Sequence, residues 1–146
     1  MGRRNSRWPI DLRVFGFLAA LWALYLAWEV FSRVTLGADA EPLRAMIAGN
    51  LFYGEQARIV LLVQAGIFWT IAVGMLAGRR WSLALALLYM LQAILSHLVF
   101  IVAYLNNRIE SHNVRIAAYE GPTIVLIALY LWIRSSDLIF PRASGS

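Results

Sequence analysis

Amide, carboxylate and imidazole side chains lie inside long apolar runs, where such groups are rare and costly. They are Glu29, Gln64, Gln92, His97 and Glu120. In a membrane, residues of these types usually face the interior of a helix bundle, pair with one another or line a pathway. Carboxylate and imidazole groups bind protons, metal ions and cationic ligands. We therefore take these five residues as a candidate ligand-binding set, with Glu29, His97 and Glu120 forming a carboxylate–imidazole–carboxylate site.

Each of these residues also has an interpretation that involves packing alone. Glu29 precedes Arg33 by four positions, which is the spacing of an ion pair along one helix face. Glu120 near the start of a helix is stabilised by the positive end of the helix dipole. His97 can hydrogen-bond a carbonyl or hydroxyl group, and the two glutamines can hydrogen-bond neighbouring helices.

Motifs of known catalytic chemistry are missing from the chain. It has no P-loop, no dinucleotide-binding glycine pattern, no His-Glu-x-x-His metal site and no Gly-x-Ser-x-Gly elbow. With no cysteine there is no thiolate nucleophile either. This favours a protein that is not an enzyme, without an assigned metal site or cofactor. One alternative remains, a pigment or haem carrier in which His97 is the axial ligand and Trp28, Phe100 and Tyr104 pack the ring.

The composition is that of a membrane protein. Hydrophobic residues make up 61% of the 146 residues and charged residues only 14%, whereas soluble domains carry roughly 25% charged residues. The basic excess consists of arginines at the ends of apolar runs, where they anchor helices at headgroups. No basic stripe with interleaved aromatic residues exists outside those runs, so we expect no nucleic-acid partner.

Four apolar runs are long enough to cross a bilayer, at residues 12–32, 59–77, 81–105 and 116–134. The first run is longer than the apolar core of a signal peptide, so we expect it to be retained. Residues 78–80 leave room only for a tight turn. The fourth helix begins at Ile116 or at Pro122, a residue suited to a first helical turn. The predicted fold is an all-α, four-helix antiparallel membrane bundle, a single domain over residues 1–146 with a tail at 141–146.

The loop after the first run has its own apolar pattern. Leu43, Met46, Ile47 and Leu51 recur at helical spacing. This predicts a short helix over about residues 43–56, lying in the membrane interface.

The arginine distribution predicts the orientation. Eight arginines flank the ends of the chain and the 78–80 turn, and five lie in the other two loops. Loops rich in arginine stay on the cytoplasmic side, so both termini are expected there, in a bacterial inner membrane.

Two rows of small residues predict close helix packing, because small side chains let helix backbones approach in lipid. They are Ala19, Ala23 and Ala27 in the first run, and Gly66, Thr70, Gly74 and Gly78 in the second. The rows serve either packing within the chain or a docking face for a partner helix or a second copy.

Three functions remain open. The first is an accessory or structural subunit that packs against a larger membrane complex or self-associates, with the lipid bilayer as its surroundings. The second is a small-molecule binding protein, transporter or membrane enzyme that uses Glu29, His97 and Glu120 in the outer leaflet. The third is the pigment or haem carrier.

Overall fold

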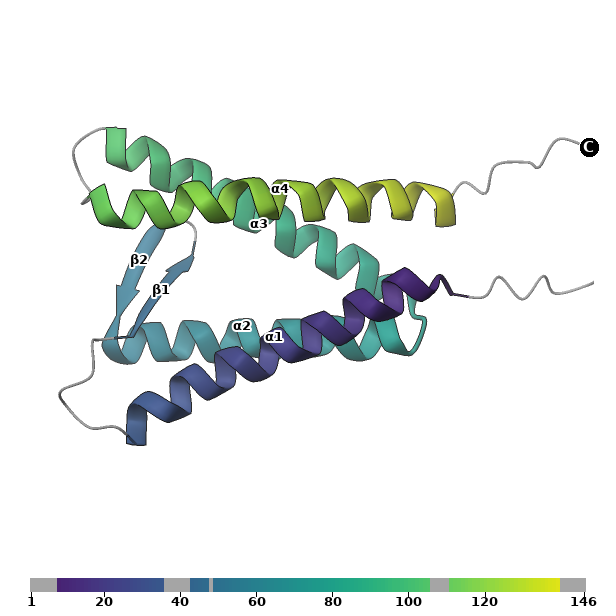
Figure 1. Cartoon of the computed structure of the whole chain (residues 1–146), viewed down its shortest axis with the longest axis horizontal. Helices are drawn as coiled ribbons and strands as arrows, with labels where there is room; N and C mark the ends of the chain where they lie inside the picture. Colours follow the sequence, from purple (N-terminus) through teal and green to yellow (C-terminus); the bar gives the residue numbers. More distant parts are fainter. Residues whose placement is uncertain (1–7, 36–42, 48, 106–110, 140–146) are drawn as a thin grey trace, which may run out of the picture. The chain divides into compact units, whose positions relative to one another are not determined.

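A computed structural model describes residues 8–35, 43–47, 49–105 and 111–139. Helices account for most of this part of the chain, and a two-stranded antiparallel hairpin precedes the second helix (Figure 1). The elements are α1 (Ile10–Thr35), β1 (Arg44–Ile47), β2 (Asn50–Tyr53), α2 (Gly54–Leu76), α3 (Arg80–Leu105) and α4 (Ser111–Ile139).

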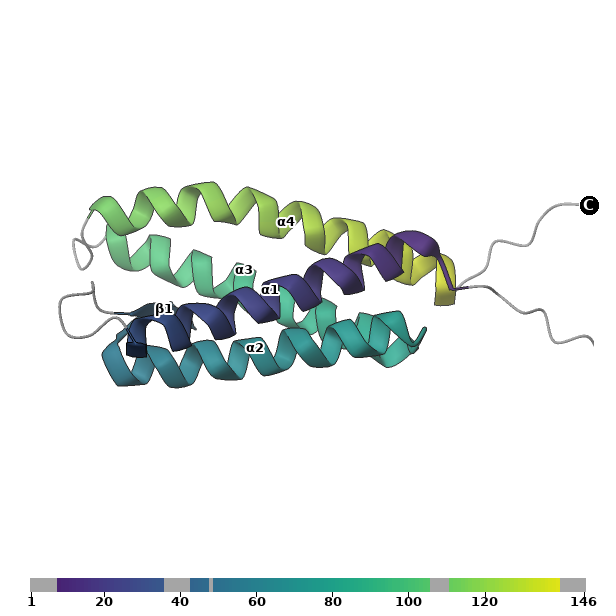
Figure 2. The same cartoon turned by 60° about the horizontal axis from the view of Figure 1, so that its bottom comes forward.

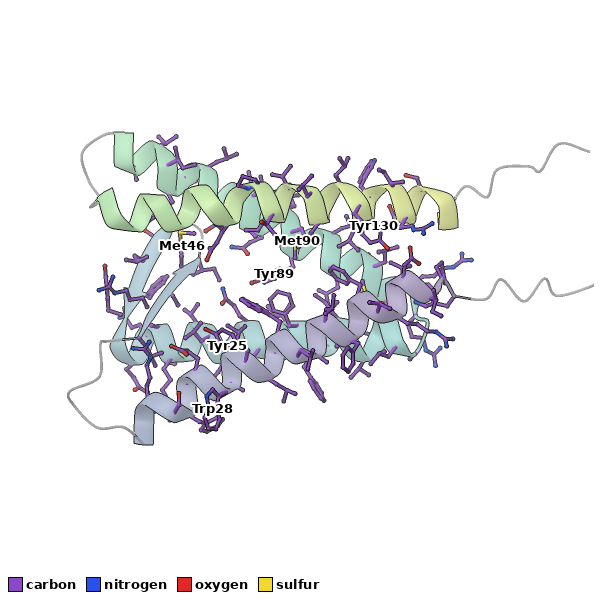
Figure 3. All side chains as sticks on the ribbon, viewed as in Figure 1. Tyr25, Trp28, Met46, Tyr89, Met90 and Tyr130 are labelled. Carbon is purple, nitrogen blue, oxygen red and sulfur yellow. The ribbon has the colours of Figure 1, made fainter. Side chains whose placement is uncertain are left out.

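Three of these helices are long and apolar enough to cross a membrane, at Ile10–Arg33, Gly54–Leu76 and Arg80–Ala103. They coincide with the first three predicted spans. They carry large apolar side chains at about half exposure or more, such as Tyr25 and Trp28 on α1 (Figure 3). Monomeric soluble proteins rarely expose contiguous apolar patches larger than a few hundred Å². The exposed faces therefore suit lipid.

The fourth helix begins earlier than predicted. Both predicted starts, Ile116 and Pro122, are wrong, because α4 already begins at Ser111 and Pro122 lies inside it. A proline inside a helix lacks the N–H that would bond one turn back, and this costs about 3 kcal/mol when nothing compensates. The first turn of α4 is polar and gave no hydropathy signal. In the part of the chain that the structure describes, α4 is not among the helices apolar enough to count as a span.

The predicted interfacial helix at about 43–56 is wrong. Residues 44–47 and 50–53 pair as antiparallel strands, with Arg44 opposite Tyr53 and Ile47 opposite Asn50, and α2 begins directly at Gly54. The chain reverses at Gly49, whose φ of 76° lies in the left-handed region that side chains rarely adopt. The Gly54 N–H donates to the Leu43 carbonyl at 3.0 Å and extends the ladder. Apolar spacing alone did not reveal this turn.

The chain divides into two compact units, Met1–Ala40 with Leu61–Ser82, and Glu41–Val60 with Leu83–Ser146. In the first unit α1 lies along the second half of α2 in antiparallel orientation (Figure 2). A Cβ on Gly16 would stand 2.9 Å from the Met75 Cβ, so the two backbones approach closely there.

Buried positions on α1 follow alternating steps of four and three residues, the spacing of left-handed helix pairs. They are Leu12, Gly16, Ala19, Ala23, Leu26 and Val30. On α2 from Leu61 onward the buried positions are Leu61, Ala65, Ile71, Ala72, Gly74 and Met75.

The turn between α2 and α3 is as tight as the sequence predicts. The Gly78 N–H donates to the Met75 carbonyl at 3.1 Å, and the Arg79 N–H donates to the Gly74 carbonyl at 2.8 Å. Gly78 has a φ of 68°. Together these features form a Schellman motif, which satisfies the last carbonyls of α2 before α3 begins at Arg80.

Candidate functional site

Two buried polar residues of the second unit, Ser96 and His97, are neighbours in α3. The apolar Phe100, one turn further along, is buried as well. The backbone N–H of Gly49, at the tip of the β-hairpin, donates to Ser96 Oγ at 2.9 Å. A Cβ on Gly49 would collide with the Val99 side chain, so only glycine lets the hairpin tip lie this close to α3. The segment therefore anchors the hairpin.

His97 faces Glu120 of α4 from the same segment. Its Nδ1 lies 2.8 Å from the carbonyl oxygen of Ala93, one turn back in α3. Its Nε2 is buried, lies 3.6 Å from Glu120 Oε2, and has no hydrogen-bond partner among the described residues. The Glu120 side chain is 59% exposed, whereas that of His97 is 10% exposed. The bond to Ala93 is the backbone contact that the packing interpretation of His97 predicts, and the approach to Glu120 is what the ligand-site hypothesis requires.

Glu29 forms an ion pair with Arg33 on its own helix. Arg33 Nε donates to Glu29 Oε1 at 2.8 Å, and a terminal nitrogen of the same guanidinium lies 2.8 Å from that oxygen. Both side chains are roughly 30% exposed, so solvent or headgroups screen the pair and it contributes little stability. The ion pair that the four-residue spacing indicates is present.

The other candidate residues are not part of the His97–Glu120 pair. Gln64 and Gln92 are half-buried. Glu29 and Gln64 belong to the first unit, whereas Gln92, His97 and Glu120 belong to the second. Within the described ranges no group of three His, Asp or Glu side chains is placed to hold a metal ion. The three-residue site with Glu29 remains a prediction.

The pigment hypothesis gains no support from this geometry. A porphyrin-type ring needs the free imidazole nitrogen together with open space beside it. In this structure Nε2 of His97 is buried next to the Glu120 carboxylate.

The two rows of small residues are used differently. Ala19 and Ala23 are buried and Ala27 is half-buried on α1. On α2, Gly74 is buried against Trp81 and Ser82, and Gly78 forms the turn that Trp8 covers. Gly66 and Thr70 are exposed, and no atom would come within 4 Å of a Cβ on Gly66. The half of the α2 row that Gly66 and Thr70 form is therefore exposed in the described part of the chain.

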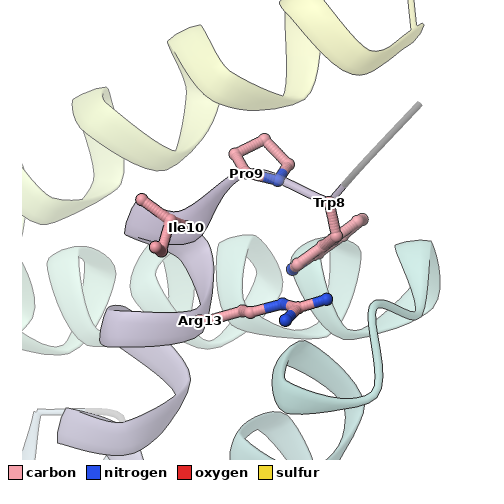
Figure 4. A pocket seen from close by; sticks show the side chains of 4 residues that line it. All are labelled: Trp8, Pro9, Ile10 and Arg13. Atoms are coloured by element: carbon pink, nitrogen blue, oxygen red, sulfur yellow. The ribbon is translucent and has the colours of Figure 1, made fainter. Parts of the chain in front are cut away.

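An open depression of about 550 Å³ lies at the start of α1, lined by Trp8, Pro9, Ile10 and Arg13 (Figure 4). None of the predicted site residues lines it. Tryptophan and arginine are typical of the membrane interface. None of its four lining residues is a carboxylate or a histidine.

Comparisons with protein-family models, with curated proteins and with solved structures found no match to this chain.

The Gly49–Ser96 bond predicts the effect of a single hydroxyl. In Ser96→Ala the buried Gly49 N–H loses its acceptor, and the free energy of unfolding should fall by about 1–3 kcal/mol. Unfolding of the detergent-solubilised protein, followed by tryptophan fluorescence, measures this loss. Ser136→Ala is the matched control, because the exposed Ser136 hydroxyl bonds only to the Trp132 carbonyl of its own helix. Equal losses in both variants would show that the hairpin anchor has no special role.

Proposed function

We propose that the chain is a four-span protein of a bacterial inner membrane with both termini in the cytoplasm. In α4 the 29 residues correspond to about 43 Å, more than the roughly 30 Å of a bilayer core. Its exposed side chains between residues 125 and 133 are Val125, Leu126, Leu129, Trp132 and Ile133, an apolar surface suited to lipid. The arginine distribution of eight against five supports the orientation.

Reporter fusions test this topology. A fluorescent protein fused after Ser146 should fluoresce, because it folds in the cytoplasm, and alkaline phosphatase at the same place should be inactive. An active phosphatase at the C-terminus would mean that α4 does not cross, or that the whole chain is inverted.

We infer further that the protein is an accessory or structural subunit, which associates through a helix face with a larger membrane complex or with a second copy. The observation behind this proposal is the exposed half of the small-residue row on α2. Gly66 leaves a notch in an otherwise bulky apolar surface, flanked by the exposed Leu62, Val63, Trp69 and Val73. The Thr70 hydroxyl donates to the Gly66 carbonyl at 2.8 Å, so its methyl group remains available for packing.

Such a notch favours a helix as the partner. In lipid no hydrophobic effect drives helices together, so association depends on close van der Waals contact, which small residues allow. The opposite side of the same helix already packs on α1 in this way. The same chemistry would then operate on both sides of α2.

Filling the notch tests this function. Gly66→Leu should weaken association roughly tenfold, about 1.4 kcal/mol, because the side chain prevents close approach of the partner helix. Purification in mild detergent with cross-linking and native mass spectrometry measures the associated fraction. Gly121→Leu is the control, since Gly121 is also helical with nothing within 4 Å of an added Cβ. A wild-type protein that purifies as a lone monomer would contradict the proposal directly.

A second candidate function is the binding or transport of a small ligand by the outer polar layer, and the approach of His97 to Glu120 favours it. If this function operates, the His97→Gln and Glu120→Gln variants should fail to restore the growth of a deletion strain in a growth competition. Glu29→Gln should have a smaller effect, since Glu29 already pairs with Arg33. Full rescue by all three variants would exclude this candidate.

A further inference from the structure

The orientation of the His97 ring determines which nitrogen faces Glu120. A carbonyl oxygen only accepts hydrogen bonds, so the 2.8 Å contact with Ala93 places a hydrogen on Nδ1, which donates. In a neutral imidazole the other nitrogen then carries a lone pair. That nitrogen, Nε2, is the one that lies 3.6 Å from Glu120 Oε2.

Without a further proton, two acceptors would face each other. The buried Nε2 lone pair would meet a carboxylate oxygen, and no described residue supplies a donor between them. A buried polar atom without a partner costs about 1–3 kcal/mol. A single added proton removes the conflict, because it makes either an imidazolium–carboxylate pair or a carboxylic acid that donates to the imidazole.

We propose that His97 and Glu120 form a proton-binding site, which holds one proton between Nε2 and Oε2 and thereby ties α4 to α3. This inference rests on the second candidate function and names the proton as its ligand. The proton adds to the pair without breaking any covalent bond, and it leaves to water or to a headgroup.

A proton suits this pair better than a metal ion. Zinc sites in proteins use at least three protein ligands, and the described residues provide no third His, Asp or Glu beside these two. An exposed carboxylate on an apolar helix is also costly in a membrane, and sharing a proton lowers its charge. The lack of a third ligand and the cost of a carboxylate charge in the membrane thus both favour a proton over a metal ion.

Other charged groups of this unit are engaged or exposed. Glu55 lies 3.6 Å from Arg58 in the first turns of α2, and Arg44 on β1 is exposed. Arg134 of α4 has an interaction of its own. Tyr53 is exposed, and Tyr89 and Tyr130 have interactions of their own. The side chains of Tyr104, His112, Arg115, Tyr119 and Asp137 lie outside the described part. Glu120 is therefore the one charged group seen to face His97 here.

The site lies next to the hairpin anchor. Ser96, which accepts from the Gly49 N–H, directly precedes His97 in α3. Gain or loss of the proton therefore changes how firmly α4 is held at the helical turn that also holds the hairpin. The pair can act as a proton-operated latch between three elements.

The experiment compares two substitutions of Glu120 in the full-length protein in detergent. In Glu120→Gln the side-chain amide donates to His97 Nε2 permanently, so the link between α4 and α3 should persist although no proton is shared. In Glu120→Leu this link should be lost. We expect the Tm of the wild type to be roughly 3–5 °C higher when the pair holds its proton, at lower pH, than when it has lost it, at higher pH.

Glu120→Gln should keep the higher Tm of the wild type and lose most of this variation, whereas Glu120→Leu should have the lower Tm throughout. Glu55→Gln is the control and should retain the wild-type profile, because Glu55 is an exposed acid outside the pair. Nitrogen NMR of the histidine rings, with His112→Gln for assignment, should find Nδ1 of His97 protonated at every pH.

Three results would overturn the proposal: a Glu120→Gln profile identical to that of the wild type, a neutral His97 with its hydrogen on Nε2, or stoichiometric Zn²⁺ binding that Glu120→Gln abolishes. A protein with the expected profile but with no growth phenotype in the Gln variants would keep the latch and exclude only the transport role.

Discussion

A backbone N–H or C=O group without a partner in lipid costs several kcal/mol, because no water replaces the missing hydrogen bond. Each described element meets this constraint in its own way. The helices satisfy it internally, apart from the position of Pro122 in α4, and the α2–α3 turn does so through the two bonds around Gly78. The β-hairpin pairs its strands with each other, and the N–H at its tip uses the Ser96 hydroxyl. The same need for a partner makes the His97–Glu120 pair notable, since there the missing partner is a proton.

Features that depend on local spacing could be predicted from the sequence. The first three spans follow from the length of their apolar runs, and the Glu29–Arg33 ion pair follows from four-residue spacing on one helix. The tight turn at Gly78 follows from the short gap between two runs. Each of these involves residues close together in the chain, where helix geometry fixes the distances.

Features that depend on distant contacts were predicted only in part. The sequence analysis places His97 and Glu120 in one candidate site, but the contact between them depends on how α3 and α4 are rotated about their axes, which periodicity does not determine. The hairpin was mistaken for a helix because its apolar residues fit both patterns, and the deciding contact at Gly49 involves α3. The start of α4 was missed because its polar first turn carries no apolar signal. Whether Glu29 belongs to the same site depends on how the two units are placed.

The hydrogen bond from Gly49 to Ser96 also has a consequence in time, because 47 residues separate its two ends. Ribosomes add about 5–20 residues per second, so roughly 2–9 s pass between synthesis of the hairpin tip and synthesis of its acceptor. During this interval the hairpin exists without the helix that anchors it. The strands can pair with each other at once, whereas the Gly49 N–H gains its acceptor only when this part of α3 has been made.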